Sequence, residues 1–539
     1  MRYLMKKKIG TIFISCALAL NSCTNLDETI YNGIVADNFY KNRTEVMAAV
    51  LRPFTHANAW ATMQDRQGYW KASELSADQL AWPQKGRHGY DGGVWIRLHN
   101  HSWTPTDNTV REPWELIWGG IGFCNNTIAD LEKVDFTKIG MTEQDKVSII
   151  AETKVLRAWH YLKLLDMYGN VPVVTTVATP LNPETKPRAE VFAFIEKEVK
   201  DNVESLQPLS PSLVGRITKA AGYAMLAELY LNAEVWAGTP RWDDCVAACD
   251  KIISGQAGGL DGAPALDPGI YGPFSVDNDK SKENLFQIAY DFKNGNFRLP
   301  FEGIFWHYRQ REINGADRDG NNGIVVIPTA FDAYKDNDLR KQKWFLIGQQ
   351  NKFGTDQPVL GTEEYNNKPL VFVKEIRRNS EGETGPGGMT RGEENSGARF
   401  NKYQVGMPTD AKYWSNDYVL YRLTEIYYNK AEALMRKNSN EATQQVVDLV
   451  NQCKQRRFMA ADWAAEQYTT ASLTMDEFLA ERGREFIFEG KRRTDLIRFG
   501  KFVTASWWDH TPTEKNKELF PIPQTQIAIN PNLKQNPGY

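Results

Sequence analysis

The sequence lacks a long hydrophobic run. Its most apolar stretch, from Ile9 to Leu20, has 12 residues, whereas a helix that crosses a bilayer needs about 20. This stretch follows Arg2 and Lys6 to Lys8, the arrangement of a secretory signal. We therefore expect residues 1–22 to be a signal peptide that is removed, and not an anchoring helix.

The chain also lacks an excess of charge of either sign. It carries 64 lysines and arginines against 67 aspartates and glutamates, a net charge of −3, and the two signs are interspersed. Binding to nucleic acid needs a basic face, so we expect no nucleic-acid partner.

Cysteine is scarce, with six in 539 residues. Cys16 lies in the signal and Cys23 directly after it, which leaves Cys124, Cys245, Cys249 and Cys453. Cys245 and Cys249 are one helical turn apart, a spacing that does not suit a relaxed disulfide. No histidine or second cysteine pair stands nearby at metal-ligand spacing. We expect four buried thiols and no disulfide framework.

Familiar catalytic motifs are absent: the sequence has no His-Glu-x-x-His, Gly-x-Ser-x-Gly, Walker or Rossmann glycine pattern. Asp317-Arg-Asp319-Gly-Asn321-Asn-Gly323 alternates oxygen side chains as a calcium loop does. Its glycine falls one position late, however, and Pro328 stands where the terminal glutamate belongs. We expect an Asx-rich turn there, with calcium as the alternative, and no other cofactor.

The residues after the apolar run indicate lipid attachment. Leu20-Asn-Ser-Cys23 resembles a bacterial lipobox, in which the cysteine is acylated, although Asn21 is unusual at its position. Several acyl chains on one cysteine hold a protein firmly to a membrane. We expect Cys23 to be the lipid anchor; the alternative is a secreted protein with a chance cysteine.

Three segments share one helical pattern, and each is followed by a second helical stretch. They begin near Glu152, Ala220 and Arg422, with small residues and aromatics on one face at i, i+3, i+4 spacing. Such pairs resemble tetratricopeptide (TPR) repeats, and they must stack because one pair cannot bury its apolar face alone. We predict a mostly α fold with a TPR-like helical scaffold over about residues 38–254 and 415–505.

Helical periodicity is lost between residues 255 and 414, where glycine and proline become frequent and only short strand-like runs occur. A second irregular stretch covers residues 63–111. Binding residues concentrate in loops held by a rigid scaffold. We therefore predict a single domain over residues 23–539, whose loop-rich insertion at residues 255–414 carries the ligand site.

Both irregular regions are rich in aromatic residues. Pro83 holds Trp82 in extended backbone, and no periodic pattern gives Trp82 or Trp306 a partner in the core. Flat aromatic rings and polar partners together hold sugar rings, which have apolar C–H faces. The candidate glycan-binding residues are Trp82, Trp306, Trp95, Tyr290, Tyr308, Trp344, Asp78 and Arg87. The alternative for each tryptophan is a place in the core.

The last 58 residues carry the most specific pattern. An arginine-rich block, Arg482-Gly-Arg-Glu-Phe-Ile-Phe-Glu-Gly-Lys-Arg-Arg, is expected to be an amphipathic helix. Its charges at residues 491–493 would pair about one turn back. A Leu519-Phe-Pro-Ile-Pro-Gln run and a Gln535-Asn-Pro-Gly-Tyr539 end follow, where prolines force extended backbone. On physical grounds alone this would be a charged surface helix with an irregular tail.

This succession closely resembles the C-terminal signature of the SusD/RagB family, outer-membrane glycan-binding lipoproteins of Bacteroidetes-type bacteria. The resemblance implies a cell-surface protein that performs no chemistry and delivers oligosaccharides to a SusC-like TonB-dependent transporter. It also implies an aromatic platform built from the two irregular regions. We expect a plant β-glucan such as xyloglucan as ligand, since near-planar tryptophan platforms suit extended β-linked chains. The alternative is a surface glycoside hydrolase.

Overall fold

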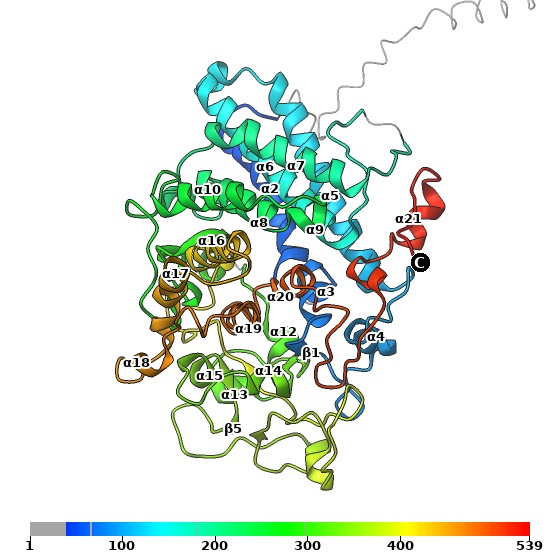
Figure 1. Cartoon of the computed structure of the whole chain (residues 1–539), viewed down its shortest axis with the longest axis vertical. Coiled ribbons are helices and arrows are strands. Elements are labelled where there is room, and N and C mark those ends of the chain that lie inside the picture. Colours follow the sequence, from blue (N-terminus) through cyan, green and yellow to red (C-terminus); the bar gives the residue numbers. More distant parts are fainter. Residues whose placement is uncertain (1–38, 65–66, 179–180, 296) are drawn as a thin grey trace, which may run out of the picture.

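The computed structural model describes residues 39–64, 67–178, 181–295 and 297–539 (Figure 1). The predicted signal peptide and Cys23 lie outside this range. The helices before the insertion are α2 (Arg43–Ala61), α3 (Tyr69–Leu75), α4 (Val94–His99), α5 (Asn108–Lys133), α6 (Glu143–Tyr168), α7 (Arg188–Asn202), α8 (Lys219–Leu231), α9 (Ala233–Ala237) and α10 (Trp242–Ile253).

The insertion and the C-terminal part contain shorter elements. The helices of the insertion are α11 (Phe292–Gly295), α12 (Glu302–Phe305), α13 (Gln310–Asn314), α14 (Pro328–Asp332) and α15 (Leu339–Lys343). The later helices are α16 (Leu423–Lys437), α17 (Gln444–Lys454), α18 (Trp463–Glu466), α19 (Met475–Phe486), α20 (Arg492–Arg498) and α21 (Gln524–Ile529). The strands are β1 (Leu80–Ala81), β2 (Asn284–Ile288), β3 (Val325–Val326), β4 (Phe345–Leu346), β5 (Gly348–Gln349), β6 (Val371–Phe372), β7 (Arg399–Phe400) and β8 (Tyr418–Arg422).

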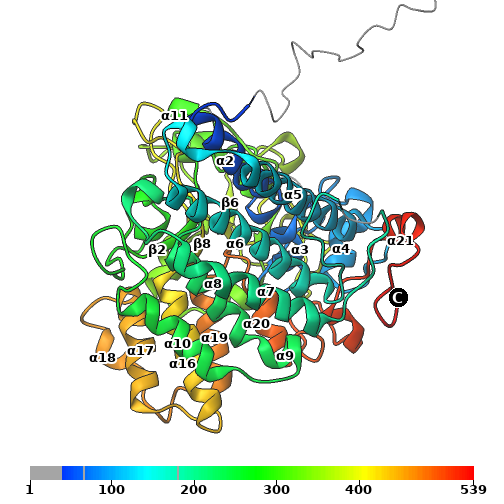
Figure 2. The ribbon, with the colours of Figure 1, turned by 90° about the horizontal axis from the view of Figure 1, so that it is seen from above.

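The long helices stack into one array, so the predicted mostly α, TPR-like scaffold is confirmed. The three predicted pairs are α6 with α7, α8 with α10, and α16 with α17, and the members of each pair pack against each other. Helix α2 packs on α5, α5 on α6, and α10 on α16, which joins the pairs (Figures 1 and 2). Small residues such as Ala220, Ala224 and Ala227 are fully buried on α8 and let its neighbours approach closely.

Local sequence signals set the ends of these helices. Helix α6 begins with a capping box, in which Thr142 Oγ1 accepts a hydrogen bond from the backbone N–H of Asp145 at 3.0 Å. The Asp145 carboxylate in turn accepts one from the backbone N–H of Thr142 at 2.9 Å. These bonds satisfy donors that a helix start otherwise leaves without partners.

The strands form four separate antiparallel pairs: β1 with β3, β2 with β8, β4 with β7 and β5 with β6. The longest pair, β2 with β8, connects the start of the insertion to the strand that leads into α16. One hydrophobic cluster extends from Tyr40 to Leu533 and includes residues of both scaffold and insertion. The insertion lies against the scaffold at the lower end of the molecule in Figure 1.

The arginine-rich C-terminal block is two helices and not one, which corrects the sequence expectation. Helix α19 ends at Phe486, and α20 begins at Arg492. Phe488 and Gly490 between them have φ angles of 72° and 73°, in the left-handed region that ends a helix. The turn buries Phe488 completely.

The expected local pairing of the charges after this turn is also wrong. Lys491 pairs with Glu425 at 3.0 Å, Arg492 with Asp78 at 2.7 Å and Arg493 with Asp166 at 3.1 Å. These partners come from distant segments because the block is packed inside the protein and meets the scaffold on several sides. A charged surface helix therefore does not describe it.

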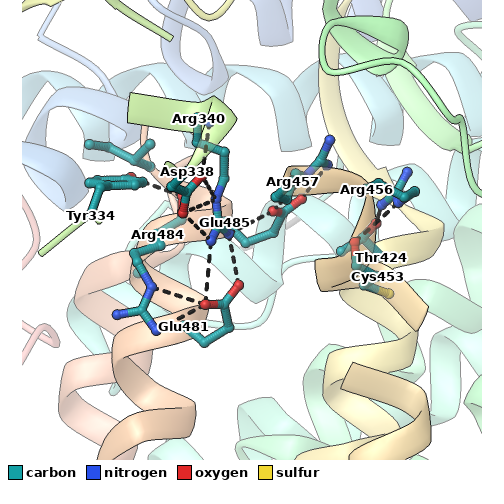
Figure 3. A network of polar contacts seen from close by, with 12 residues as sticks. Tyr334, Asp338, Arg340, Thr424, Cys453, Arg456, Arg457, Glu481, Arg484 and Glu485 are labelled. Carbon is teal, nitrogen blue, oxygen red and sulfur yellow. Dashed lines mark hydrogen bonds and ion pairs between the residues drawn. The ribbon is translucent and has the colours of Figure 1, made fainter. Parts of the chain in front are cut away.

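Glu485 of α19 is the centre of a buried ion network (Figure 3). Its carboxylate accepts hydrogen bonds from Arg340 at 3.0 Å, from Arg422 at 2.9 Å and from Arg457 at 2.6 Å. Arg340 also donates to Glu481 at 2.7 Å. All of these side chains are buried.

The network ties three parts of the chain together. Arg340 belongs to α15 of the insertion, Arg422 to β8, and Arg457 to the turn after α17. Burial alone would raise the pKa of Glu485, but Arg457, Arg422 and Arg340 hold it well below its ordinary value. The carboxylate is therefore charged at neutral pH, and it holds the insertion in place relative to the scaffold.

The four cysteines of the described chain, Cys124, Cys245, Cys249 and Cys453, are buried free thiols, as predicted. Across the described ranges, no helix combines the length and the apolar character that crossing a membrane requires.

Candidate functional site

The two irregular regions meet at one place, as a site built from both requires. Strand β1, in the irregular stretch at residues 63–111, pairs with β3 of the insertion, with Leu80 opposite Val326 and Ala81 opposite Val325. Beyond β1, the Lys85 ammonium donates hydrogen bonds to the carbonyls of Asn322 and Gly323, at 2.6 and 2.5 Å. These contacts fix the segment after Trp82 against the insertion.

Trp82 lies at this junction and is partly exposed. Its ring is stacked on Trp95, with centroids 4.7 Å apart and an angle of 3° between the planes. Gly323 packs so closely that a Cβ there would lie 2.8 Å from the Trp82 ring. Trp95 itself is buried, and its indole N–H donates to Asp91 at 2.7 Å. Trp95 therefore supports Trp82 from behind.

A pocket of about 150 Å³ opens beside this junction. Its walls come from the hairpin at residues 85–88 and from the insertion. They include Lys85, His88, Tyr308, Asn322, Glu364, Tyr365, Arg378, Ser380, Glu381, Glu393 and Glu394. Tyr308 is partly exposed, and its ring centroid lies 5.6 Å from that of His88. Predicted residue Tyr308 is thus brought next to the hairpin that follows Trp82.

The floor of the pocket is held by buried polar groups. His307 Nε2 lies 3.0 Å from Glu394 Oε1, and burial lowers the pKa of His307 to about 4. His307 is therefore neutral at pH 7. The backbone N–H of Thr362 donates to the same Glu394 oxygen at 2.8 Å. These contacts fix the Glu394 carboxylate at the pocket wall.

Two exposed side chains follow Trp82 along the same segment, Arg87 in the hairpin and Tyr90 just after it. Arg87 has 78% of its side chain exposed and lies 3.3 Å from Glu364. Tyr90 is 52% exposed, more than any other tyrosine in the described residues. Tyr90 was not among the predicted site residues. Its place in Gly89-Tyr90-Asp91-Gly92-Gly93 is a signal for exposure, because glycines with positive φ surround it and leave few neighbours to cover a ring.

Four of the aromatics predicted to bind glycan lie in the core: Trp95, described above, and Trp306, Trp344 and Tyr290. For Trp306 this corrects the expectation that it lacks a core partner. Trp306 is 3% exposed and packs on Trp414 and Phe301, with ring centroids 4.8 and 5.8 Å away. Trp344 is fully buried beneath the Lys402 ammonium, 4.1 Å from its centroid. The Tyr290 ring is buried against Phe297. Neither Trp306 nor Trp344 presents a face to a ligand in this structure, and Tyr290 is almost fully buried at the wall of the groove described below.

Asp78 does not offer a free carboxylate to a ligand. Arg492 donates to both of its oxygens, at 2.7 and 2.8 Å. The pair fixes the segment just before β1 to α20, so its role is to position the segment that carries Trp82.

The calcium alternative finds no support in the loop at residues 317–323. The Asp317 carboxylate accepts a hydrogen bond from Tyr413 at 2.6 Å, and Asp319 accepts one from the backbone N–H of Arg311 at 2.9 Å. In the residues that the structure describes, no group of three or more histidine, cysteine or acidic side chains is placed to hold a metal ion.

A larger groove of about 740 Å³ lies elsewhere, between the scaffold loop at Pro211 and the segment at residues 411–417. Its charged groups are largely paired, for example Lys282 with Asp261 at 2.7 Å and Lys412 with Asp279 at 2.9 Å. Its aromatic lining residue, Tyr290, is buried. The smaller pocket beside Trp82 therefore fits a stacked ligand better.

Comparisons with known proteins agree with this architecture. Residues 45–231 match a family model described as "Starch-binding associating with outer membrane", and residues 282–539 match the model of the SusD family. The starch-binding protein SusD of Bacteroides thetaiotaomicron is 24% identical over 518 residues, covering 87% of this chain and 84% of that protein. A SusD-like protein of Bacteroides ovatus is 21% identical, covering 93% and 84%.

Solved structures share the fold. A SusD superfamily protein from Parabacteroides distasonis superposes with a TM-score of 0.70 at 18% identity, covering 92% of this chain and 99% of the other. Surface glycan-binding protein A from Bacteroides thetaiotaomicron, solved with laminarihexaose, gives a TM-score of 0.68 at 20% identity, with the same coverage. Since the two family models match on both sides of the insertion's start and together span most of the sequence, the chain belongs to the SusD/RagB family.

Proposed function

We propose that the protein captures a glycan, and that Trp82, Tyr90 and Tyr308 bind it next to the pocket of about 150 Å³. The observation that carries this proposal is the partly exposed Trp82 ring, held flat on the buried Trp95 beside a pocket lined by carboxylates. Relatives named for starch binding and a neighbour solved with laminarihexaose support the ligand class.

The chemistry of these side chains suits a sugar chain. A pyranose ring offers an apolar C–H face to an aromatic ring and hydroxyls around its edge. Trp82, Tyr90 and Tyr308 supply the aromatic surfaces. The Glu364 and Glu394 carboxylates and Arg87 supply acceptors and donors at the side. Stacking and hydrogen bonding therefore act from adjacent walls.

Xyloglucan stays a prediction, and the relatives named for starch and laminarin widen the set of polysaccharides to test. Affinity electrophoresis against starch, laminarin, xyloglucan and host glycans identifies the ligand. Retardation by at least one polysaccharide is expected, and failure to bind any of them contradicts the proposal.

Trp82→Ala and Tyr90→Ala should each weaken glycan binding by about 1–3 kcal/mol, the range found when a stacking ring is truncated. Melting should change little for Tyr90→Ala, since this ring is 52% exposed. The measurement pairs calorimetric titration with a thermal melt, and Phe353→Ala is the control because Phe353 is similarly exposed at 54%. Retained affinity with a lowered melting temperature would show that Trp82 belongs to the core.

A surface glycoside hydrolase is the second candidate, because four glutamates line the pocket. The relatives are named as binding proteins, which supports capture without hydrolysis. An assay for new reducing ends separates the two functions: a binding protein releases none, and a hydrolase releases them in proportion to time.

We further propose that residues 23–539 form one SusD-like domain anchored by acylated Cys23 in the outer membrane, with a SusC-like transporter as partner. The lipobox and the family support this proposal. Cys23→Ala should lose acyl labelling and leave the membrane fraction, whereas wild type should be extracted by gentle detergent together with a large β-barrel protein. Wild-type protein that carries no lipid would contradict the anchor. Wild-type protein that is repeatedly extracted without a β-barrel protein would contradict the proposed partner.

A further inference from the structure

The pocket beside Trp82 is joined to this ring through shared walls. The hairpin at residues 85–88 lines the pocket, and Gly89 directly after it approaches Trp82, since a Cβ there would lie 3.3 Å from the indole nitrogen. On the insertion side, Asn322 lines the pocket and Gly323 contacts the Trp82 ring. A chain that contacts Trp82 therefore lies next to the pocket.

The size of the pocket limits what enters it. Its volume is about 150 Å³. This is about half of the smallest pockets that hold drug-sized ligands, at roughly 300 Å³. A pocket of this size suits one sugar ring better than a longer piece of chain.

The lining favours hydroxyl groups over anions. Glu364, Glu381, Glu393 and Glu394 all face the pocket, whereas Arg378 is the one arginine among its walls. Arg378 lies 3.8 Å from Glu381, and the Lys85 ammonium is engaged by two carbonyls. Arg87 of the hairpin is paired with Glu364. Carboxylates accept hydrogen bonds from hydroxyls but repel a uronate or sulfate group.

We propose that this pocket takes a single uncharged sugar unit, either the end of a chain or a side branch, of the glycan whose neighbouring unit lies on Trp82. This inference rests on the proposed function and adds the ligand class and the mode of recognition to it. The pocket is small and opens to the surface, so a chain end or a side branch fits it better than the middle of a chain, and ends or branches determine binding. Polyuronates and sulfated polysaccharides are excluded by the acidic walls.

The test uses a substitution that fills the pocket with a large side chain and leaves Trp82 unchanged. Ser380 lines the pocket and is exposed, so Ser380→Trp should occupy the space without disturbing the core. Ser254→Trp is the matched control, since Ser254 is exposed at the end of α10, away from the pocket walls. Titrations use laminarihexaose, maltohexaose and xyloglucan heptasaccharide as neutral probes and alginate oligosaccharide as the anionic probe.

For a neutral probe that binds wild type, Ser380→Trp should lower affinity at least tenfold, and Ser254→Trp should leave it unchanged. Alginate oligosaccharide should bind at least tenfold more weakly than that neutral probe. If Trp82→Ala abolishes binding but Ser380→Trp retains it, the pocket inference is overturned and the proposed function stands. If alginate oligosaccharide binds as tightly as the neutral probe, the restriction of the pocket to uncharged sugars is overturned. If no probe binds wild type, the pocket inference and the proposed function both fail.

Discussion

Replacing Glu485 by alanine is expected to lower the free energy of unfolding by about 3–5 kcal/mol, the cost of removing one partner from a buried charge cluster. The carboxylate contacts Arg340, Arg422 and Arg457, and all three guanidinium groups are fully buried. Without Glu485, they repel one another in a medium of low dielectric. Urea unfolding monitored by tryptophan fluorescence measures the change.

The expected effect of Glu485→Ala depends on burial and not on the number of ion pairs. Asp243→Ala is the control, because Asp243 is 81% exposed where it pairs with Lys437, and exposed pairs contribute little. Glu485→Gln keeps the shape and removes the charge. The difference in unfolding free energy between Glu485→Gln and wild type should narrow as the pH falls below 4.5, the ordinary pKa of a glutamate. The pKa of the wild-type carboxylate is lowered, so this group becomes protonated in the folded protein only in that acidic range. Equal losses for Glu485→Ala and Asp243→Ala would show that the network contributes no stability.

Trp306→Ala should lower the free energy of unfolding by about 3–5 kcal/mol, as expected for removing a large aromatic ring from a packed core. Trp306 is 3% exposed and is enclosed by Trp414 and Phe301. Its loss leaves a cavity that these rings fill only in part. Thermal melting and urea unfolding of the variant measure the change in the free energy of unfolding.

Trp306→Phe separates packing from recognition, since it keeps an aromatic ring in the core and should lose less stability than Trp306→Ala. Either variant should retain glycan affinity at a temperature where it is folded. Unchanged unfolding of Trp306→Ala together with lost glycan binding would show instead that the ligand reaches this ring.

Helical periodicity was sufficient to predict the scaffold. The segments that became α6, α8 and α16 carry small and aromatic residues on one face over several turns, and this pattern forces a partner helix whatever the rest of the chain does. The same holds for the loop-rich insertion, where glycine and proline exclude long elements. The family followed from the C-terminal signature, because residue identities at that density are specific.

The residues of the site were only partly predictable. Trp82 and Trp306 both stand in irregular segments, and nothing local separates them. Trp82 rests on Trp95 and stays partly exposed, whereas Trp306 meets Trp414, more than 100 residues later, and is buried. Glu394 reaches the pocket from a distant loop, and no local pattern announces such a residue.

By itself, the sequence therefore determined the helical scaffold, the place of the irregular insertion, the buried free thiols and the family, since each depends on periodicity, composition or residue identity along the chain. Only the tertiary structure decided which aromatic rings are exposed and which charges are buried. Arg492 meets Asp78 and Glu485 meets Arg340 across more than a hundred residues. Exposure and ion pairing depend on what packs against a side chain, and that partner comes from a part of the chain that local sequence does not specify.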